Sequence, residues 1–299
     1  MGKYNKVINV LVIIIVILAS IACLAGLLIN GGNGQYLFKS INGEVVKIYG
    51  SGLYKYDSIS VVSQGKATDL VTLILGVPLL LVSLYFTSKN SFRGMLVLTG
   101  TLGYFLYTYM SYTFLWNYNP FFIVYVMIMS LSFYAFVLCL MSYQIDKLQS
   151  MFSDQLPVKF LGGFQIFIGF MLGMLWFGRI APSIMGGEVP FGLEHYTTLV
   201  IQGMDLGFIV PTAFLSGILL IKRKPFGYLL SSVIIVKGMT MLTCMSAMII
   251  NQAINKVSMN IVEVVVFPAF NCLALICLVL LMKNVKVRKV SEIGLATNS

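Results

Sequence analysis

The chain has 299 residues, of which 59% are hydrophobic and only 10% are charged, and its formal net charge is +10. Its mean hydropathy is +0.92. Soluble domains usually contain about 25% charged residues, so a water-soluble fold of this length has no way to bury so much apolar surface. Composition therefore excludes a soluble domain. It predicts an all-α integral membrane protein with the lipid bilayer as its solvent.

A transmembrane helix needs about 17–25 mostly apolar residues. Eight segments meet this requirement, and polar or turn-forming stretches separate them; in chain order they are 7–29, 67–87, 95–116, 121–141, 160–178, 198–221, 227–250 and 261–282. The apolar run of the first is longer than the core of a signal peptide, so we expect it to remain as an uncut first span. The sequence thus predicts a multi-pass protein of about eight spans.

The basic residues lie mostly on one side of these spans. With the N-terminus in the cytoplasm, thirteen Lys and Arg fall in cytoplasmic segments, six in outer segments, and Lys237 within a span. Because cytoplasmic loops are enriched in Lys and Arg, this asymmetry predicts that both termini are cytoplasmic. It also accounts for the net positive charge, so we expect no nucleic-acid partner. Sixteen Lys against four Arg suggest an AT-rich genome and a bacterial plasma membrane.

Short motifs recur in the same order in the two halves of the chain. The matching pairs are Gly43-Glu44-Val45 with Gly187-Glu188-Val189, Gly52-Leu53 with Gly192-Leu193, Tyr56 with Tyr196, Gln64-Gly65 with Gln202-Gly203, Asp69-Leu70 with Asp205-Leu206, and Val77-Pro78 with Val210-Pro211. Chance recurrence in a hydrophobic chain is the alternative. The pattern predicts two parallel four-helix repeats, which in transporters often enclose a site at their interface.

The predicted repeats are residues 1–150, with a long outer loop at 30–66, and residues 151–283, with an outer loop at 179–197. Residues 284–299 are predicted to form a short cytoplasmic tail. Within the fifth span, Gly169 and Gly173 have the spacing that permits close helix packing. Aromatic residues gather between Tyr104 and Tyr125, and most of them are predicted to form an interfacial belt at the outer surface. Tyr104 and Tyr107 lie deeper and could line a cavity.

Two charged residues fall within predicted spans, Asp205 in the sixth and Lys237 in the seventh. A charge near the bilayer centre costs about 2.5–3.5 kcal/mol on insertion scales, so we expect the two to pair, either as a structural bridge or as a functional relay. Helical spacing places polar residues on one face of the sixth span, namely Thr198, Gln202, Asp205, Thr212 and Ser216. Asp69 lies at an outer helix end, where solvation at the interface is the simpler interpretation. The candidate solute or ion pathway comprises Asp205, Lys237, Gln202, Thr212 and Asp69.

The two outer loops contain a second set of polar residues. They are predicted to rim an outer vestibule, formed by Glu44, Tyr56, Glu188, Glu194, His195 and Tyr196. His195 is the only histidine, and no phosphate-binding glycine loop or metal-binding motif is present, so we expect no metal, no cofactor and no catalytic site. The five cysteines fall in apolar runs and are expected to be free thiols.

These features leave several functions open. The polar stripe, the intramembrane charges and the predicted repeats favour a small-solute or ion transporter with a polar site in the outer half of the bundle. The first alternative is a non-catalytic membrane sensor or assembly partner that binds through its outer loops. The second is an intramembrane lipid-modifying enzyme, with Glu188, Glu194, His195 and Asp205 as its acid–base groups. A retinal Schiff base at Lys237 is disfavoured, because the position one turn earlier is Val233 rather than a carboxylate.

Overall fold

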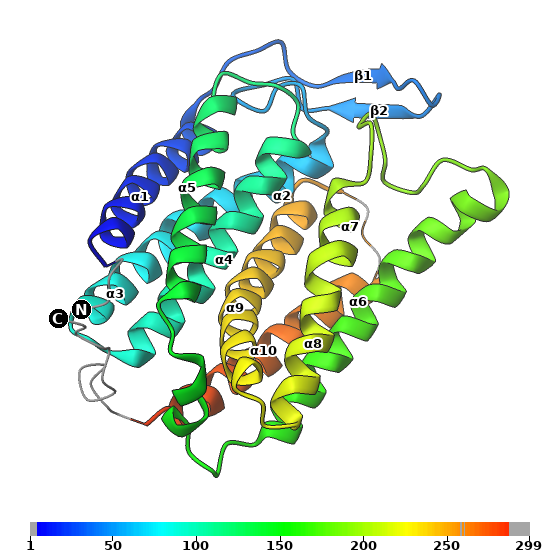
Figure 1. The fold of residues 1–299 in the computed structure, drawn as a ribbon. Coiled ribbons are helices and arrows are strands. Elements are labelled where there is room, and N and C mark those ends of the chain that lie inside the picture. The colour runs from blue at the N-terminus through cyan, green and yellow to red at the C-terminus, as the bar shows by residue number, and fades with distance from the viewer. Residues whose placement is uncertain (1–4, 258, 260, 287–299) are drawn as a thin grey trace.

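A computed structural model describes residues 5–257, 259 and 261–286. Long helices run side by side, and a small hairpin lies at the end of the molecule opposite the first turn of α1 (Figure 1). The elements of the first half are α1 (Asn5–Leu28), β1 (Tyr36–Lys39), β2 (Val45–Ile48), α2 (Ile59–Val71), η1 (Thr72–Gly76), α3 (Val77–Ser88), α4 (Phe92–Phe114) and α5 (Phe122–Met141). After the short 3₁₀ turns η2 (Ile145–Lys147) and η3 (Gln149–Met151) come α6 (Val158–Gly186), α7 (Val200–Met204), η4 (Asp205–Ile209), α8 (Val210–Ile221), α9 (Pro225–Ile254) and α10 (Ile261–Lys283).

Among the described residues, seven helices are long and apolar enough to cross a membrane. They are Asn5–Leu28, Ile59–Ser88, Phe122–Met141, Val158–Gly186, Val200–Ile221, Pro225–Ile254 and Val264–Lys283. Their outward faces carry exposed aliphatic side chains, as Ile13, Ile17 and Ile21 do on α1. Such surfaces are stable only in an apolar solvent. The chain is therefore a multi-pass, helical membrane protein.

The predicted third span, 95–116, corresponds to α4, which is 23 residues long but is not among these seven helices. Its sequence is less apolar because it contains several threonines and tyrosines. α4 packs against α3, α5 and α9, so few of its side chains need to be compatible with lipid. The count of eight spans remains a prediction, with α4 as the eighth.

Two predicted boundaries were wrong, and both outer loops are shorter than expected. α2 begins at Ile59 rather than at residue 67, because the Ser58 hydroxyl caps the helix by accepting a hydrogen bond from the Val61 amide at 3.2 Å. α6 continues to Gly186 rather than ending at 178. Arg179, in this added stretch, donates a hydrogen bond to the Phe191 carbonyl at 2.7 Å. A hydropathy profile detects only where an apolar run ends. Both helices continue beyond that point, through polar residues that form hydrogen bonds.

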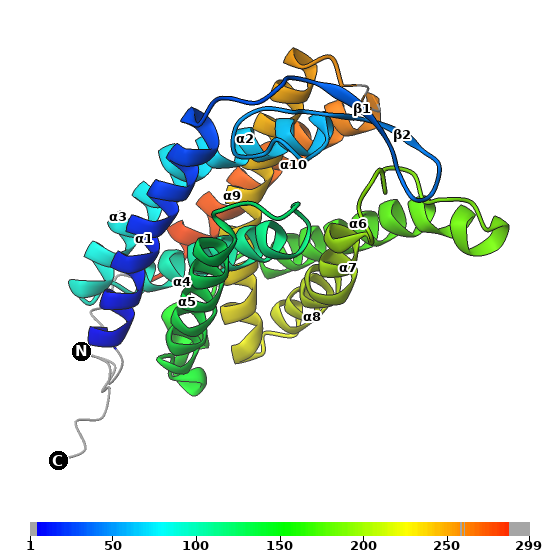
Figure 2. The same ribbon diagram turned by 90° about the horizontal axis from the view of Figure 1, so that it is seen from above.

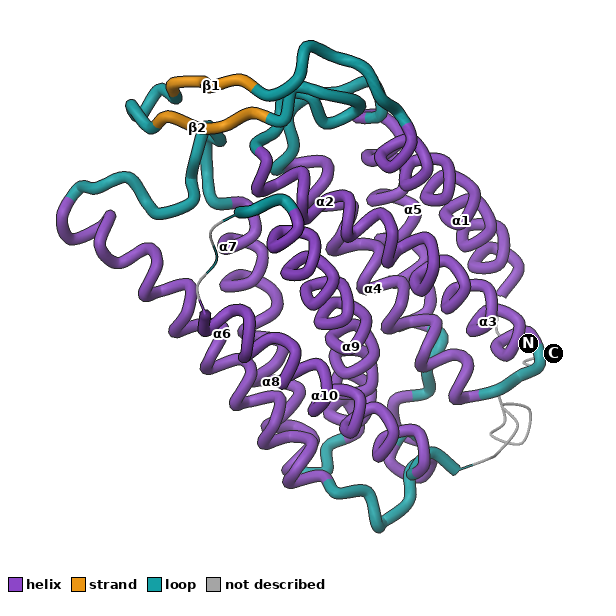
Figure 3. The backbone as a smooth tube through the Cα atoms, turned by 180° about the vertical axis from the view of Figure 1, so that it is seen from behind, coloured by secondary structure: helices purple, strands orange, loops and turns teal. Residues whose placement is uncertain are grey.

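The first outer loop contains the only strands in the part of the chain that the structure describes. β1 and β2 are antiparallel, with Tyr36 opposite Ile48, and Gly43 adopts φ +85° in the turn between them. The hairpin was not predicted. It lies over the end of the bundle near α7 (Figures 1 and 3), and the Phe38 ring meets the His195 ring at a centroid distance of 6.0 Å. The outer loops of the two halves are therefore in contact.

Helices α2, α4 and α9 bring the two halves together. Seen from above, α9 lies between the helices of the first half and the pair α6 and α8 (Figure 2). In the first half, α1 packs along α5. In the second half, α6 packs on α8 and α10 packs on α9. Between α6 and α10 the structure gives a ring contact of Phe167 with Phe270, at a centroid distance of 6.0 Å.

Two helices are interrupted in the same way. η1 and η4 are five-residue π-helical segments, and each is followed by Val-Pro, at Val77-Pro78 and at Val210-Pro211. The matched glycines Gly52 and Gly192 also share a left-handed backbone, with φ of +65° and +78°. Asp69 and Asp205, however, do not occupy equivalent positions relative to the π-helical segments. Asp205 is the first residue of η4, whereas the first residue of η1 is Thr72. The duplication itself stays a prediction.

Candidate functional site: a cavity between the two halves

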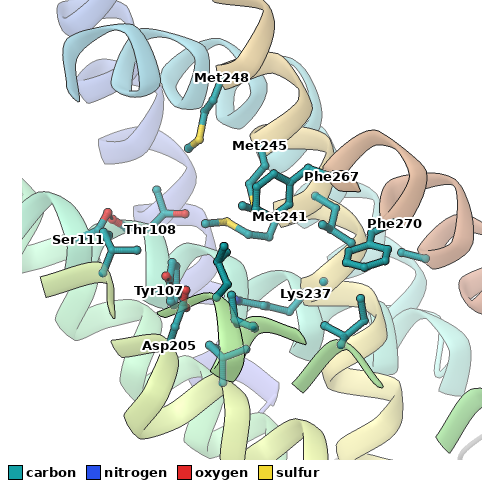
Figure 4. A pocket seen from close by; sticks show the side chains of 18 of the residues that line it. Tyr107, Thr108, Ser111, Asp205, Lys237, Met241, Met245, Met248, Phe267 and Phe270 are labelled. Carbon is teal, nitrogen blue, oxygen red and sulfur yellow. Dashed lines mark hydrogen bonds between the residues drawn. The ribbon is translucent and has the colours of Figure 1, made fainter. Parts of the chain in front are cut away.

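A cavity of about 310 Å³ lies among α2, α4, α6, α8, α9 and α10 (Figure 4). Its walls are mostly apolar, and include Leu172, Met241, Met245, Phe267 and Phe270. A smaller set of polar side chains converges on it, with Tyr107, Thr108, Gln165, Asp205 and Lys237 among them. Apolar walls with a few placed polar groups are typical of small-molecule sites in proteins.

Asp205, the first residue of η4, has both carboxylate oxygens occupied. The Tyr107 hydroxyl donates a hydrogen bond to Oδ1 at 2.7 Å, and the Trp176 indole Nε1 donates one to Oδ2 at 2.9 Å. The side chain is only 7% exposed. Two neutral donors thus hold a buried carboxylate, and they offset part of the free energy lost when it leaves water.

Lys237 of α9 is 8% exposed and does not contact Asp205 directly. Its Nζ lies 4.0 Å from the centroid of the Tyr107 ring, which is a cation–π contact. Tyr107 therefore stands between the two charges, with its ring toward the lysine and its hydroxyl on the aspartate. No salt bridge joins Lys237 to Asp205 directly, although the two charges attract each other across Tyr107. Within the described chain, the Lys237 amino group has no hydrogen bond or ion pair.

A second donor at the cavity is also unused. Thr108, next to Tyr107 on α4, is buried, and its Oγ1 has no hydrogen-bond partner among the described residues. Gln165 differs, because its Oε1 accepts from Ser216 Oγ at 2.5 Å and its Nε2 donates to the Leu161 carbonyl at 3.0 Å. Among the described residues, the polar side chains at the cavity without a hydrogen bond therefore include the Lys237 amino group, the Thr108 hydroxyl and the Gln64 amide.

Asp69 lies behind the cavity wall. It is the eleventh residue of α2 and only 3% exposed, so the expected solvation at a helix end was wrong. The Tyr54 hydroxyl donates to its Oδ2 at 2.6 Å, and the Tyr112 hydroxyl donates to its Oδ1 at 2.9 Å. Tyr112 itself lines the cavity. Each half thus contributes one buried aspartate that is held by a tyrosine of α4.

The other two predicted pathway residues, Gln202 and Thr212, do not line the cavity. The π-helical segment explains this for Thr212. In an uninterrupted α-helix, residues seven apart lie on one face, but a π-helical turn inserts one extra residue. The residue below Asp205 is therefore Ala213, which lines the cavity, and Thr212 is turned away from it.

Four of the six predicted vestibule residues meet in a contact between the outer loops. Asp57 lies at its centre, and its Oδ1 accepts hydrogen bonds from the Asn117 amide at 3.0 Å, from Asn117 Nδ2 at 3.1 Å and from the Tyr196 hydroxyl at 3.0 Å. His195 Nε2 lies 3.0 Å from the Tyr56 carbonyl oxygen. Glu194 is the fourth of these residues, and its Oε2 is buried without a partner. Glu44 and Glu188 are exposed, and none of the six lines the cavity.

Burial changes the acidity of this loop contact. It raises the pKa of Asp57 to about 6, even though the hydrogen bonds from Asn117 and Tyr196 act in the opposite direction. Burial also raises the pKa of Glu194 and lowers the pKa of His195. All three shifts favour the neutral form of the side chain.

Sequence reasoning did not identify Thr108, Tyr112 and Trp176 as site residues. It did expect Tyr104 and Tyr107 to lie deeper in their span, where they could line a cavity, and Tyr107 does so. It assigned most of the aromatic cluster to an interfacial belt, which fits the exposed Tyr118 but not the tyrosines of α4, which are buried. The usable signal was the repeated tyrosine within one helix, at 104, 107, 109 and 112. Among the described residues, no group of three His, Cys, Asp or Glu side chains is placed to hold a metal ion, and the five cysteines are free thiols.

Comparison with protein-family models, with curated proteins and with solved structures finds no match for this chain.

Proposed function

We propose that this protein is a small-solute transporter, and that its solute binds in the cavity between the two halves. The observation that supports this most directly is the Lys237 amino group, which is buried in the cavity without a hydrogen bond or ion pair among the described residues. Buried intramembrane charges are costly and commonly mark the path of a substrate or ion. A purely structural lysine is expected to pair with Asp205 directly, and this one does not.

The surrounding residues have complementary roles in this proposal. Lys237 and Thr108 bind the solute, and Asp205 fixes the position of Tyr107 beneath the lysine through the hydrogen bond to its hydroxyl.

The orientation is also a proposal. Basic residues at the end opposite the hairpin include Lys89, Arg93, Lys147, Lys222, Arg223 and Lys224. The first turn of α1 and the last turn of α10 lie at this end of the molecule (Figure 1). We place this basic end in the cytoplasm and the outer-loop contact outside, in a bacterial plasma membrane. Three basic residues of the charge count lie outside the described residues, namely Lys3, Arg288 and Lys289. Residues 287–299 of the predicted tail also lie outside them.

The two alternatives have different support. A sensor or assembly partner is favoured by the ordered contact between the outer loops around Asp57. A lipid-modifying enzyme loses its proposed acid–base set, because Glu188, Glu194 and His195 do not line the cavity that holds Asp205.

Accessibility of the cavity from the two sides of the membrane separates transport from sensing. Gly238 lines the cavity, and a side chain added there meets no atom within 4 Å, so a cysteine fits without distortion. Gly207 is the matched control, because it has the same open space but is exposed and does not line the cavity. Each variant is made in a chain whose five native cysteines are replaced, and is reconstituted in liposomes.

A transporter exposes its site alternately to both sides. We therefore expect the cysteine of Gly238→Cys to react with an impermeant maleimide added outside and, in a separate sample, with one enclosed in the liposomes. The cysteine of Gly207→Cys should react with neither. Reaction of Gly238→Cys from one side only, or from neither side, counts against transport.

A further inference from the structure

We propose that the solute is a small amphipathic organic anion. Its carboxylate, or an equivalent anionic group, binds the Lys237 amino group and the Thr108 hydroxyl. Its apolar body lies against the methionine and phenylalanine side chains above them. This inference rests on the proposed function, because it assumes that the cavity is the binding site.

The sign of the solute charge follows from which polar groups are already satisfied. The carboxylate oxygens of Asp205 accept hydrogen bonds from Tyr107 and Trp176, whereas the Lys237 ammonium has three donors and uses none of them on described residues. An anion gives these donors charge-assisted hydrogen bonds, which are about twice as strong as neutral ones. A cationic solute puts a second positive charge beside Lys237, and a neutral solute offers its three donors no charged acceptor.

The position of Thr108 supports the same assignment. Thr108 is the neighbour of Tyr107, whose ring lies under the lysine Nζ, and its buried hydroxyl has no hydrogen-bond partner among the described residues. In Figure 4, Thr108 lies level with Met241, and Lys237 lies below them. An anionic group with two or three acceptor oxygens has enough acceptors for both donors.

The apolar walls of the rest of the cavity favour a solute whose remaining part is apolar. Met245 and Phe267 lie above the polar groups in Figure 4, and Phe270 lies to one side. A solute that is polar throughout gives up its hydration at these walls without replacement. The cavity volume of about 310 Å³ is at the lower end of small-molecule sites, which span about 300–1,000 Å³. Its size therefore favours one short apolar chain or ring over a whole two-chain membrane lipid.

The protein contains its own reporter for such binding. It has only two tryptophans, and both Trp116 and Trp176 line the cavity. Bromine quenches tryptophan fluorescence at short range, so a bromine-tagged solute in the cavity is detected without any added label. The probes are 8-bromo-octanoate, 8-bromo-octanol and 8-bromo-octylammonium, which differ only in their head group. The protein is held in nanodiscs of uncharged lipid.

We expect saturable quenching by 8-bromo-octanoate with an affinity at least about tenfold higher than for the alcohol or the ammonium, because one charge-assisted contact is worth about 1.5–3 kcal/mol. Lys237→Met should reduce the affinity for the carboxylate to that for the alcohol, and Lys237→Arg should retain most of the preference. Thr108→Val should weaken carboxylate binding about fivefold and leave alcohol binding unchanged. If Lys237→Met does not fold, the anion assignment is tested by the Thr108→Val variant and by the comparison of the three head groups on the unaltered protein.

Failure of this inference is distinguishable from failure of the proposed function. Gly238→Leu fills the cavity and should abolish saturable quenching by all three probes, whereas Gly207→Leu should not. If the alcohol or the ammonium binds as tightly as the carboxylate, and Gly238→Leu still blocks binding, the cavity is a site but the anion assignment is wrong. If no probe gives saturable quenching, or if Gly238→Leu has no effect, the cavity is not the binding site and the proposed function fails as well.

Discussion

Tyr107 links the two intramembrane charges, because its hydroxyl binds Asp205 and its ring faces Lys237. A direct ion pair needs the two side chains to meet, and a dry ion pair must offset the desolvation of both ions. With a tyrosine between them, the aspartate is satisfied by neutral donors, and the lysine amino group forms no hydrogen bond to a described residue. In the proposed transporter, these unused donors bind the solute.

Removal of the Tyr107 hydroxyl tests this bridge. Tyr107→Phe keeps the ring under Lys237 but leaves Oδ1 of Asp205 without its donor, so we expect a loss of about 1–3 kcal/mol in the free energy of unfolding. In double-mutant cycles, Asp205→Asn should couple to Tyr107→Phe by more than about 0.5 kcal/mol, and less strongly to Lys237→Met. Unfolding in detergent measures all three variants. Stronger coupling of Asp205 to Lys237 than to Tyr107 would show that the charges interact directly.

Asp57 gives the outer-loop contact a dependence on pH. Its pKa of about 6 in the folded protein lies above the value of 3.8 for a free side chain, so the stabilising contribution of this group is present below pH 3.8 and is lost as pH rises through 6. A difference of this size corresponds to about 3 kcal/mol. Glu194, with a raised pKa, acts in the same direction, and His195, with a lowered pKa, acts in the opposite one.

Asp57→Asn isolates the contribution of Asp57. The variant retains Oδ1, the atom that accepts the hydrogen bonds from Asn117 and Tyr196. Its stability relative to the unaltered protein should therefore increase as pH rises from about 4 to about 7, as measured by thermal unfolding across that range. A stability difference that is independent of pH would mean that Asp57 does not titrate with a raised pKa.

The elements were predicted best where the signal is local. An apolar run of about twenty residues identifies a span, and most of the helix ends lie close to those read from the sequence. The π-helical segments were not predictable, because one inserted residue leaves the hydropathy unchanged while it rotates every later side chain. That rotation is why Thr212 was assigned to the cavity in place of Ala213. Tyr109 and Tyr112 of α4 were assigned to the interface because burial depends on the helices that surround them.

Close packing of α6 on α8 depends on glycines other than the predicted Gly169 and Gly173. A Cβ added at Gly162 would lie 2.6 Å from the Gly217 carbonyl oxygen, and one added at Gly217 would lie 2.6 Å from the Gly162 carbonyl oxygen. At Gly169 the nearest atom would be the Ala213 Cβ at 3.2 Å, and at Gly173 a side-chain carbon of Val210 at 3.8 Å. The tight contact therefore lies nearer the basic end of the helix than the sequence spacing indicated.

Gly162→Ala and Gly163→Ala form a matched pair of neighbours. Gly162→Ala must push the α8 backbone away, so we expect a loss of about 1–3 kcal/mol in stability. Gly163 has no atom within 4 Å of an added Cβ, and Gly163→Ala should be neutral or gain up to about 1 kcal/mol through helix propensity. Thermal unfolding of the two variants in the same detergent provides the comparison. Equal effects would show that the α6–α8 contact is looser than described.

At the scale of the whole molecule, the candidate site was only partly predictable. Asp205 and Lys237 were identifiable because charges are rare within spans, and that signal needs no tertiary information. The cavity lies between two packed helix pairs, α9 with α10 and α6 with α8. No sequence pattern indicates how far apart these two pairs lie. The unused Thr108 hydroxyl is likewise a consequence of packing, since an isolated threonine in an apolar helix is unremarkable in sequence.

The orientation of the whole molecule gives the last prediction. If the basic end is cytoplasmic, the hairpin turn and the loop after α6 face outward. Cysteines that replace the exposed Asn42 and Glu188 should then react with an impermeant thiol reagent applied to intact cells. Cysteines that replace the exposed Lys147 and Lys224 should react only after the cells are permeabilised. Glu188 is preferred to Gly187, whose φ of +70° disfavours a side chain.

The same cysteines also test whether α4 is a span, because the number of crossings between Asn42 and Glu188 is even only if α4 crosses the membrane. If Asn42→Cys reacts from outside and Glu188→Cys does not, α4 does not cross the membrane; if Lys147→Cys and Lys224→Cys are the pair that reacts in intact cells, the orientation is inverted.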